Sequence, residues 1–509
     1  MIKLKIIIIL LFSSITCSHS QDKQDYIWLF GHDSRVIPGN ESYKFDFGKG
    51  SSPDSIRGVL PLQFTGNNAS VCDKDGNLLF YTNGCHVSGA NHEIMANGSD
   101  LNAGIWLEEF RNGICTVYPG TQDILILPDP EFIGGYYILH KTIEFDQGLF
   151  MDNVKYTYVD MNLNNGDGDV TEKNIDILPE GEILLFSYLT AIAHSNNEGY
   201  WITVTTQNEE FLMILLDNSN FSIEGRFKAP VEFVENSSGA GTAKFSPDGS
   251  GFAYYNAYEN LLLYDFDRSS GELTNLRQLN LRNISPTDNV FSSVEWSPNS
   301  RFLYVAIQDE LWQVDTWEDD LEDGKVLIDR WNGVQDPFAT VFFLMALAPD
   351  CKIYMCSTSS TNSYHVINKP NEKGTACDFV QQGIRLPFVS ATATMPNFPR
   401  FRVDEEDKCD PTITSIFGDD VFYRRDMTVY PNPVRDVLTV EIPEGMKGRI
   451  VVFDMQGQLV SDDKCRDQDC QGLVQVDLSG LITGTYSVEF LPEDNKERLV
   501  YTAQVVKVE

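Results

Sequence analysis

A tight turn recurs along the middle of this chain at a fixed spacing. Its clearest copies are Ser246-Pro247-Asp248-Gly249, Ser297-Pro298-Asn299-Ser300 and Ala348-Pro349-Asp350, and a weaker copy, Ser195-Asn196-Asn197, lies upstream. The small first residue stands at positions 195, 246, 297 and 348, so each step is 51 residues. Proline and aspartate favour tight turns, and glycine suits a following position with positive φ. A period of this kind predicts a fold built from repeated units.

Each turn is followed by runs of strand-forming residues. After the turn at Ser246, residues 252–256, 261–266 and 273–281 are rich in apolar and aromatic residues, and a polar turn separates the last two runs. Together with the run before the turn, they predict a four-stranded antiparallel unit, as in one blade of a β-propeller. Aromatic residues make up 12% of the chain, which also favours strands over helices.

The number of blades follows from the number of turns. Weaker copies at 72–77 and 127–129 bring the total to six, and the longer step from 127 to 195 predicts an insertion in that blade. A seventh blade would form if the N-terminal run 26–31 joined a last strand at 398–403, which would close the ring and remove exposed sheet edges. We predict an all-β chain with a seven-bladed propeller over residues 21–403, with six blades as the alternative.

Several segments then show a family resemblance. The Ser-Pro-Asp-Gly turns resemble those of propellers of the WD-repeat type. Residues 76–84 (GNLLFYTNG), 91–98 (NHEIMANG) and 189–194 (LTAIAH) resemble a group of secreted Bacteroidetes propeller proteins. The resemblance implies the fold and says little about activity, because propellers support many functions.

The C-terminal part has a different character. Residues 404–424 are charged and irregular, which predicts a linker. Residues 425–509 contain short alternating runs separated by turn residues, which predicts a small Ig-like β-sandwich. The motifs of this region are a Pro-Asn-Pro opening, an Asp-x-x-Gly hairpin, a Leu-x-x-Gly-x-Tyr segment and a terminal lysine. Their residues are Tyr430, Pro431, Asn432, Pro433, Asp454, Gly457, Gly484, Tyr486 and Lys507.

This set of motifs resembles the type A C-terminal sorting domain of the Bacteroidetes type IX secretion system. The resemblance implies that the type IX machinery is a partner and that the domain carries its cargo across the outer membrane. It also implies that the domain is usually cut off when the cargo is released or attached at the surface. The longer loop with Cys465 and Cys470 departs from the pattern, and an ordinary adhesive sandwich is the alternative.

The N-terminus fits export. Lys3 and Lys5 precede a short apolar run, and Ser18-His19-Ser20 forms a small-x-small cleavage site, so residues 1–20 are predicted to be a secretory signal peptide. Acylation of Cys17 is the rival interpretation. We predict no membrane span after signal removal, and a secreted or outer-surface location reached through the periplasm.

The charge excludes some partners. The formal net charge is −36, and such a chain repels nucleic acid and anionic membranes. Export permits disulfides among the nine cysteines that remain after Cys17. Cys465 and Cys470 flank a polar turn and are either a disulfide or two reduced thiols. Cys351 and Cys356 point to opposite faces of a strand and are not expected to bridge.

A catalytic or metal centre is not evident in the sequence. Serine-hydrolase elbows and phosphate-binding loops are absent. The histidines left after signal removal are His32, His86, His92, His140, His194 and His365. The closest two, His86 and His92, have a spacing that fits neither a helical nor a strand pair, so we interpret the histidines as structural, with metal ligation as the alternative.

One loop carries oxygen ligands at alternating positions. Asp160, Asn162 and Asn164 precede a glycine-rich stretch, which suggests a calcium loop. Gly166 lies one place late for an EF-hand, however, and Thr171 stands where a closing glutamate is needed. We therefore favour a solvated turn between strands and predict no cofactor, with calcium as the alternative.

Three functions are compatible with these observations. The first is a non-enzymatic propeller that binds protein or glycan on the face of the ring where loops converge. The second is an extracellular polysaccharide hydrolase or lyase, which would need carboxylates, or an arginine and a histidine, clustered at the central channel. The third is a structural part of the cell envelope or gliding machinery. We predict the first, because regular blades occur without a local catalytic motif.

Overall fold

The computed structural model describes most of the chain. The described residues are 23–31, 42–48, 54–55, 60, 62–106, 108, 118–146, 148–233, 241–285, 287–386, 393–403, 423–442, 447–454, 459–465, 472–492 and 499–508. The predicted signal peptide and residues 404–422 of the predicted linker lie outside these ranges, so both stay predictions. The last two residues of the predicted linker, Tyr423 and Arg424, already belong to the first strand of the C-terminal part.

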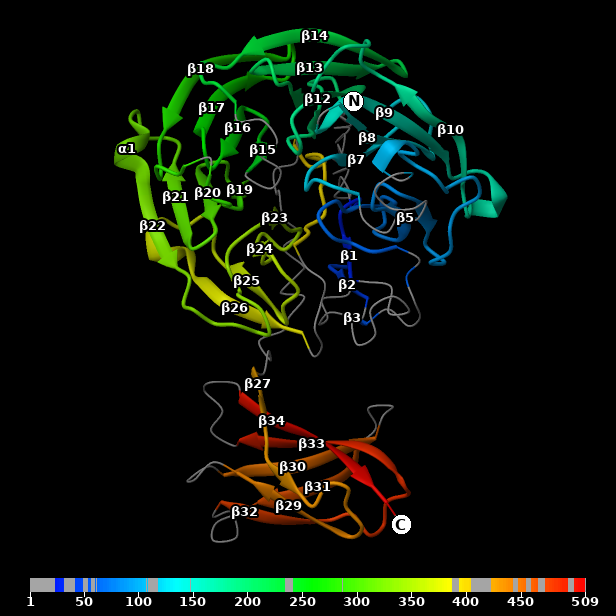
Figure 1. Cartoon of the computed structure of the whole chain (residues 1–509), viewed down its shortest axis with the longest axis vertical. Coiled ribbons are helices and arrows are strands. Elements are labelled where there is room, and N and C mark those ends of the chain that lie inside the picture. The colour runs from blue at the N-terminus through cyan, green and yellow to red at the C-terminus, as the bar shows by residue number, and fades with distance from the viewer. Residues whose placement is uncertain are drawn as a thin grey trace, which may run out of the picture.

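Seven antiparallel sheets surround a common axis in the described part of the chain (Figure 1). The first two have three described strands: β1 (Ile27–Phe30), β2 (Tyr43–Asp46) and β3 (Asp54–Ser55), then β4 (Ala69–Cys72), β5 (Leu78–Thr82) and β6 (Val87–Gly89). The third contains β7 (Ile124–Pro128), β8 (Gly135–Phe145), β9 (Leu149–Asp160) and β10 (Asp169–Asp176). The chain is therefore a β-propeller with seven blades, the larger of the two predicted numbers.

The remaining blades have four strands each. They are β11 (Thr190–Ala193), β12 (Gly199–Thr205), β13 (Glu210–Asp217) and β14 (Asn220–Lys228); β15 (Gly241–Phe245), β16 (Gly251–Asn256), β17 (Asn260–Asp267) and β18 (Glu272–Leu279); β19 (Ser292–Trp296), β20 (Phe302–Ile307), β21 (Glu310–Asp315) and β22 (Lys325–Arg330); and β23 (Met345–Leu347), β24 (Ile353–Met355), β25 (Ser363–Ile367) and β26 (Phe379–Arg385). Helical turns are short: η2 (Asn164–Gly166), α1 (Leu321–Gly324) and η3 (Gly374–Cys377).

The predicted turns join the first and second strands of their blades. In the blades that begin with β15 and β19, the hydroxyl groups of Ser246 and Ser297 each accept a hydrogen bond from the amide that opens the next strand, at 2.8 Å. The same hydroxyl groups donate to Asp248 and Asn299 two residues later. The serine thus closes the turn from inside, which explains why serine recurs there.

The upstream copy of the turn is shifted by one residue. His194, not Ser195, follows β11 directly, and its backbone amide donates to Gly199, as Ser246 donates to Gly251. The Nδ1 atom of His194 lies 2.7 Å from the Oδ1 atom of Asn196. The imidazole therefore makes the contact with the residue two places later that the serine hydroxyl makes in the other turns, and in this way His194 braces this blade.

The aromatic residues form much of the core between blades. Trp28 of β1 is fully buried and contacts Phe47 and Tyr354, with ring centroids 5.0 and 5.9 Å apart. The hydroxyl groups of Tyr43 and Tyr364 lie 2.5 Å apart across the same interface. These contacts pack the first blade against the seventh and close the ring.

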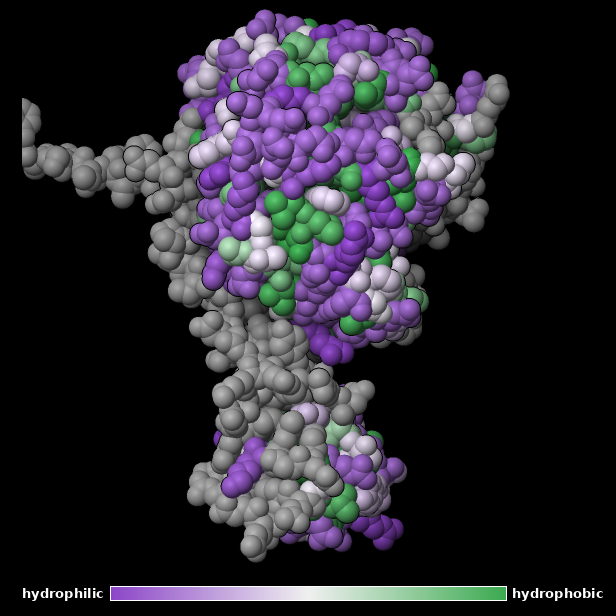
Figure 2. Space-filling view, turned by 90° about the vertical axis from the view of Figure 1, so that its left-hand side faces the viewer, coloured by the Kyte–Doolittle hydropathy of each residue, from purple (hydrophilic) through white to green (hydrophobic). Residues whose placement is uncertain are grey.

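Figure 2 views the side that carries α1 and β22, where a mainly hydrophilic surface surrounds a small hydrophobic area.

The predicted way of closing the seventh blade was wrong in its hydrogen bonding. β1 pairs with β2, and no ladder joins it to residues 398–403 in the described part of the chain. Pro396 and Pro399 lack the N–H groups that a ladder requires. The two segments nevertheless meet through side chains, because Phe398 contacts Trp28 and Arg402 pairs with Asp25.

The C-terminal residues form a two-sheet sandwich, drawn from orange to red in Figure 1. One sheet has the order β27-β34-β33-β30-β31 and the other β28-β29-β32. Their bounds are β27 (Tyr423–Asp426), β28 (Val429–Tyr430), β29 (Val437–Glu441), β30 (Gly448–Asp454), β31 (Leu459–Cys465), β32 (Leu473–Asp477), β33 (Gly484–Pro492) and β34 (Leu499–Lys507). Alternate residues such as Leu438, Val440 and Val488 are fully buried between the sheets. The predicted Ig-like sandwich is confirmed.

Candidate functional site

Residues 393–403 run through the middle of the ring, and we call them the axial segment (Figure 1). Its backbone joins blades that are far apart in sequence. The amide of Ala393 donates to Ser357 of the seventh blade, and the amide of Asn397 donates to Asn68, which leads into β4 of the second. The amide of Arg400 donates to Ala191 of β11 in the fourth blade.

The side chain of Asn397 extends these contacts to the third blade. Its Nδ2 atom donates to the carbonyl groups of Ile124 and Leu189, each at 2.9 Å. The side-chain Nε2 atom of Gln122 donates to the Oδ1 atom of Asn397 and, at 2.8 Å, to the carbonyl of Ala243 in the fifth blade. Apart from Ser357, which follows β24, these partners lie on first strands or on the residues leading into one, so the segment lies along the propeller axis.

Arg400 reaches the fifth and sixth blades. Its Nε atom donates to the carbonyl of Phe245 at 2.9 Å, and its Nη2 atom forms an ion pair with Glu295. Glu295 also lies 3.7 Å from the ammonium of Lys244. Burial alone would raise the pKa of Glu295, but the charges of Arg400 and Lys244 outweigh it and hold this pKa below its usual value.

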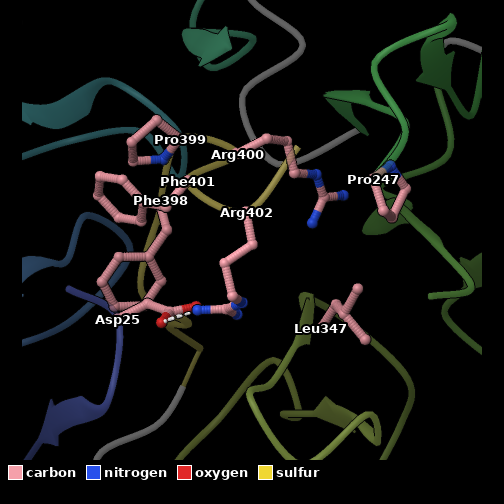
Figure 3. Close-up of a pocket in the computed structure, with 8 residues that line it drawn as sticks. All are labelled: Asp25, Pro247, Leu347, Phe398, Pro399, Arg400, Phe401 and Arg402. Atoms are coloured by element: carbon pink, nitrogen blue, oxygen red, sulfur yellow. Dashed lines mark hydrogen bonds and ion pairs between the residues drawn. The ribbon is translucent and has the colours of Figure 1, made fainter. Parts of the chain in front are cut away.

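Arg402 completes the set by pairing with Asp25, which precedes β1. Two parallel hydrogen bonds join the guanidinium and carboxylate groups, one of them 2.7 Å long. The axial segment therefore bonds to all seven blades. Figure 3 shows one end of the axis, where a cavity of about 40 Å³ remains between Asp25, Pro247, Leu347 and residues 398–402. This volume has room for little more than water.

The axial segment bears on the search for a catalytic centre. A channel enzyme needs carboxylates, or an arginine and a histidine, exposed to a substrate in the channel. The arginines on this axis, Arg400 and Arg402, point to carboxylates of the chain itself, Glu295 and Asp25, so these charges are already paired. Sequence reasoning missed this arrangement, although Pro396 and Pro399, followed by Arg400 and Arg402, were a signal against an ordinary last strand.

A second buried ion pair lies near the start of β7. Asp123 and Lys141 are fully buried, with the Nζ and Oδ1 atoms 3.1 Å apart. The ammonium also donates to the carbonyl groups of Leu185 and Ser187, and the carboxylate accepts from the amide of Ser187. Burial raises the pKa of Asp123 and lowers that of Lys141. The pair ties the third blade to the segment that leads into the fourth.

The described histidines have structural hydrogen bonds. His140 is buried between Asn102 and Thr157, and burial lowers its pKa to about 3. His365 is also buried, with a pKa lowered to about 4, and accepts from the amide of Gln382. His92 contacts the hydroxyl of Tyr81, and the amide of Asp100 donates weakly to His86. His32 lies outside the described residues.

The candidate calcium loop forms the turn between β9 and β10 and includes η2. Asp160 accepts hydrogen bonds from the backbone and side-chain amides of Asn162, and the side chain of Asn164 donates to Gly168. These bonds are those of a tight polar turn. Within the described ranges, no group of three or more histidine, cysteine, aspartate or glutamate side chains is placed to hold a metal. Calcium binding stays a hypothesis.

The structure shows both free and bridged cysteines among the residues that it describes. Cys72, Cys356 and Cys377 are free and buried, whereas Cys85 and Cys351 are disulfide-bonded. The prediction that Cys351 and Cys356 do not bridge each other is confirmed. Cys470 lies outside the described residues, so its pairing with Cys465 stays a prediction.

The C-terminal motifs converge at one end of the sandwich, although they are far apart in sequence. The side chain of Asn432 donates to the carbonyl of Gln504 at 2.8 Å and accepts from the amide of Val506 at 2.9 Å. The primary amide thus replaces a peptide group at the edge of β34, where Pro431 and Pro433 have no N–H to offer. Tyr430, Pro431 and Pro433 beside it are exposed.

The other motif residues surround this contact. Gly484 lies opposite Lys507 in the pairing of β33 with β34, and Tyr486 lies opposite Asp454 in the pairing of β33 with β30. The buried Tyr486 donates its hydroxyl to the carbonyl of Ile482 at 2.8 Å, an arrangement similar to the tyrosine corner of Ig-like sandwiches. Lys507 is largely buried and donates to Val508. Gly457 lies outside the described residues.

Comparison with known families agrees with this geometry. Residues 428–503 match the model of the secretion system C-terminal sorting domain. The chain therefore carries a type IX sorting domain, which directs export to the cell surface or beyond. No curated protein matches the chain. In the described part of the chain, no helix is both long and apolar enough to span a membrane.

Solved structures with a similar fold are distant in sequence. The periplasmic gluconolactonase PpgL of Pseudomonas aeruginosa has 13% identity and a TM-score of 0.35, with 72% of this chain and 99% of that chain covered. The Cps50 propeller domain of Myceliophteria thermophila has 10% identity and a TM-score of 0.36, covering 63% and 87%. PorZ, a surface component of the type IX system of Porphyromonas gingivalis, has 10% identity and a TM-score of 0.30, covering 92% and 69%. No ligand or activity is transferred from them.

Proposed function

We propose that this chain is an exported β-propeller that binds a protein or a glycan on one face of its ring, delivered by its sorting domain. The observation that carries the proposal is the axial segment. It fills the place where a channel enzyme would hold substrate, and its arginines are paired with Glu295 and Asp25. Binding of a ligand on a face of the ring is compatible with a filled axis, whereas cleavage of a polysaccharide in the channel by a hydrolase or lyase is not.

The face opposite the serine turns offers a contact surface. The first strand of each blade runs towards the repeated turn that joins it to the second strand. The connections between successive blades therefore lie on the opposite face of the ring. In the connection between β22 and β23, Phe338 has 55% of its surface exposed. Close by, Asp336 forms an ion pair with Arg385 at 3.1 Å and accepts from the side chain of Asn362. An exposed ring beside fixed polar groups is a common way to bind sugars and peptides.

A pair of variants tests both parts of the proposal. The mature full-length protein is applied to a broad glycan array, and the same sugars are assayed for new reducing ends. We expect binding without cleavage, lost in Phe338→Ala. Trp317→Ala is the matched control, because Trp317 is 67% exposed on the turn after β21, at the other face. New reducing ends would support the hydrolase or lyase hypothesis. If neither binding nor cleavage is detected, the search moves to protein partners, including those of the cell envelope.

A further inference from the structure

The third blade, where the step from residue 127 to 195 exceeds the repeat, has the two longest strands of the described propeller. β8 contains 11 residues and β9 contains 12. Their register shifts between Thr142 and Ile143, because Asp152 is an extra residue on β9. Such a β-bulge bends its strand and re-aims side chains, and bulges are common beside binding sites. This bulge lies near the end of the hairpin that points away from the repeated turns.

A groove lies between this hairpin and the connection from β10 to β11. The side chain of Asn153 accepts from the amide of Leu178 at 3.1 Å and donates to its carbonyl at 3.0 Å. Further along, the amide of Leu184 donates to the carbonyl of Met151 at 2.8 Å. Between these two contacts the connection has residues 179–183 but β9 has a single residue, so the connection bends away from the strand. The resulting groove of about 500 Å³, which we call the third-blade groove, has the size of a ligand-binding site.

Most charges in the third-blade groove are negative. The lining includes one ammonium group and a larger number of carboxylates, those of Lys155, Glu144, Asp152, Asp176, Glu180 and Glu182. Two of the carboxylates are neutralised within the chain, because Asp176 pairs with Lys155 at 2.6 Å and Glu182 pairs with Arg226.

The other three, Glu144, Asp152 and Glu180, form no ion pair among the described residues. Asp152 accepts a hydrogen bond from the hydroxyl of Thr142 at 2.6 Å, which leaves its charge in place. Burial, and then the nearby charge of Asp152, raise the pKa of Glu144 above its ordinary value. These two carboxylates therefore repel each other, and a cation beside them would relieve the repulsion.

Apolar side chains line the same groove. Leu178 is buried, Phe150 is half-buried and Ile183 is 39% exposed. Apolar groups beside unpaired carboxylates match lysine and arginine, which have a long apolar stem and a charged end. Within the ranges that the structure describes, no three histidine, cysteine, aspartate or glutamate side chains are placed to hold one metal ion. The negative charges are therefore spread along the groove, as several cations joined in one chain would require.

We infer that the third-blade groove binds a basic peptide segment of a protein partner. The stems of its lysine or arginine side chains lie on Phe150 and Ile183, and their charged ends lie at the three unpaired carboxylates. The formal net charge of −36 favours the approach of such a partner. The groove is on the same face as Phe338 but in a different blade, so this site goes beyond the ligand proposed above and does not depend on it.

Binding of a fluorescent tetralysine peptide to the mature full-length protein tests the site, and a tetraglutamate peptide is the probe that should not bind. Because an acidic protein attracts any cation, the variants must separate the groove from the remaining surface. Glu144→Gln combined with Glu180→Gln removes two charges from the groove. Glu272→Gln combined with Asp319→Asn is the matched control, because both side chains are exposed on other blades.

We expect the groove pair of substitutions to weaken tetralysine binding about tenfold and the control pair at most about twofold. Ile183→Ser should also weaken binding, by about threefold, whereas Leu163→Ser, with the same 39% exposure outside the groove, should not. Equal weakening by the two charge pairs would overturn the inference, since the net charge alone would then attract the peptide. Absence of tetralysine binding to the unaltered protein would also overturn it.

Carbodiimide coupling of the bound peptide gives a second readout that needs no variant. Peptide mapping should find the lysines joined to Glu144, Asp152 or Glu180, and couplings spread over carboxylates outside the groove would contradict the site. Phe338→Ala separates the two proposals, because it should bind tetralysine like the unaltered protein. Peptide binding with a silent glycan array would count only against the site at Phe338, and glycan binding without peptide binding only against the groove.

Discussion

The guanidinium group of Arg402 forms two parallel hydrogen bonds with the carboxylate of Asp25, which lies 377 residues earlier in the sequence. This pair joins the last residues of the propeller to the residues that precede its first described strand. It replaces the shared β-ladder that often closes such rings, and it adds to the side-chain contacts between the first and seventh blades. The axial segment and the residues before β1 therefore close the propeller ring together.

Breaking this pair should destabilise the whole propeller. We expect Arg402→Ala to lower the free energy of unfolding by about 3–5 kcal/mol, because it leaves the nearly buried Asp25 without its partner. The double variant with Asp25→Ala should lose less than the sum of the two single variants. Urea unfolding of the mature protein measures all three. Arg226→Ala, which breaks a surface pair, is the control and should cost at most about 1 kcal/mol. Equal effects at positions 402 and 226 would contradict the closing role.

Two buried histidines predict a loss of stability in mild acid. The pKa of His140 is lowered to about 3 and that of His365 to about 4 by burial, from an ordinary value of 6.5. As the pH falls below 6.5, these histidines therefore bind protons in the unfolded chain but stay neutral in the folded chain. The free energy of unfolding is therefore highest above pH 6.5 and decreases as the pH falls. Each histidine should cost about 2 kcal/mol at pH 5 relative to pH 7.5.

The measurement is the free energy of unfolding at a series of pH values between 7.5 and 5. His140→Gln and His365→Gln should each flatten the profile in this range. A profile as steep in both variants as in the unaltered protein would show that other groups carry the pH dependence.

Replacing Asn432 should change the rate of amide hydrogen exchange at its backbone partner. Its Oδ1 atom is the acceptor for the amide of Val506, so Asn432→Ala should speed exchange at Val506 at least tenfold. Asn432→Asp keeps an acceptor and loses the donor to Gln504, so exchange at Val506 should stay slow. The amide of Val505, which belongs to the pairing with β33, serves as the internal control. Unchanged exchange at Val506 in Asn432→Ala would contradict the peptide-like role of this side chain.

The serine of the repeated turn should contribute to the stability of each blade separately. Ser297→Ala removes the acceptor for the buried amide of Phe302, so we expect a loss of about 1–3 kcal/mol. Ser195→Ala is the matched control, because His194 holds the equivalent place in its turn. Thermal unfolding compares the two variants, and a larger effect at Ser195 would show that the turns are wrongly aligned.

The sequence predicted features that depend on neighbouring residues. The turns at Ser246 and Ser297 are closed by bonds that span at most five residues, so their pattern was visible as a repeat. The strands of the sandwich were visible for the same reason. The bracing position of His194 in its turn was visible in the same way, but the alignment on the small residue Ser195 was one place late, because an imidazole nitrogen makes the contact there that a hydroxyl makes in the other turns.

The long-range features were beyond such reasoning. The side-chain amide of Asn397 donates to the carbonyl groups of Leu189 and Ile124, 208 and 273 residues away, and nothing in the local pattern around Asn397 indicates these partners. Likewise, the motif spacing did not show that Asn432 meets Val506, 74 residues later. A resemblance identified the sorting motif, whereas the structure shows which of its residues hold the domain together.

The most direct test of the account is the location of the propeller with and without its sorting domain. Cells with a type IX system are fractionated after expressing the full chain or a chain that ends at residue 424. We predict that the full chain reaches the surface or the medium, while the shortened chain stays in the periplasm as a folded, protease-resistant propeller. Export of the shortened chain to the same extent would contradict the account.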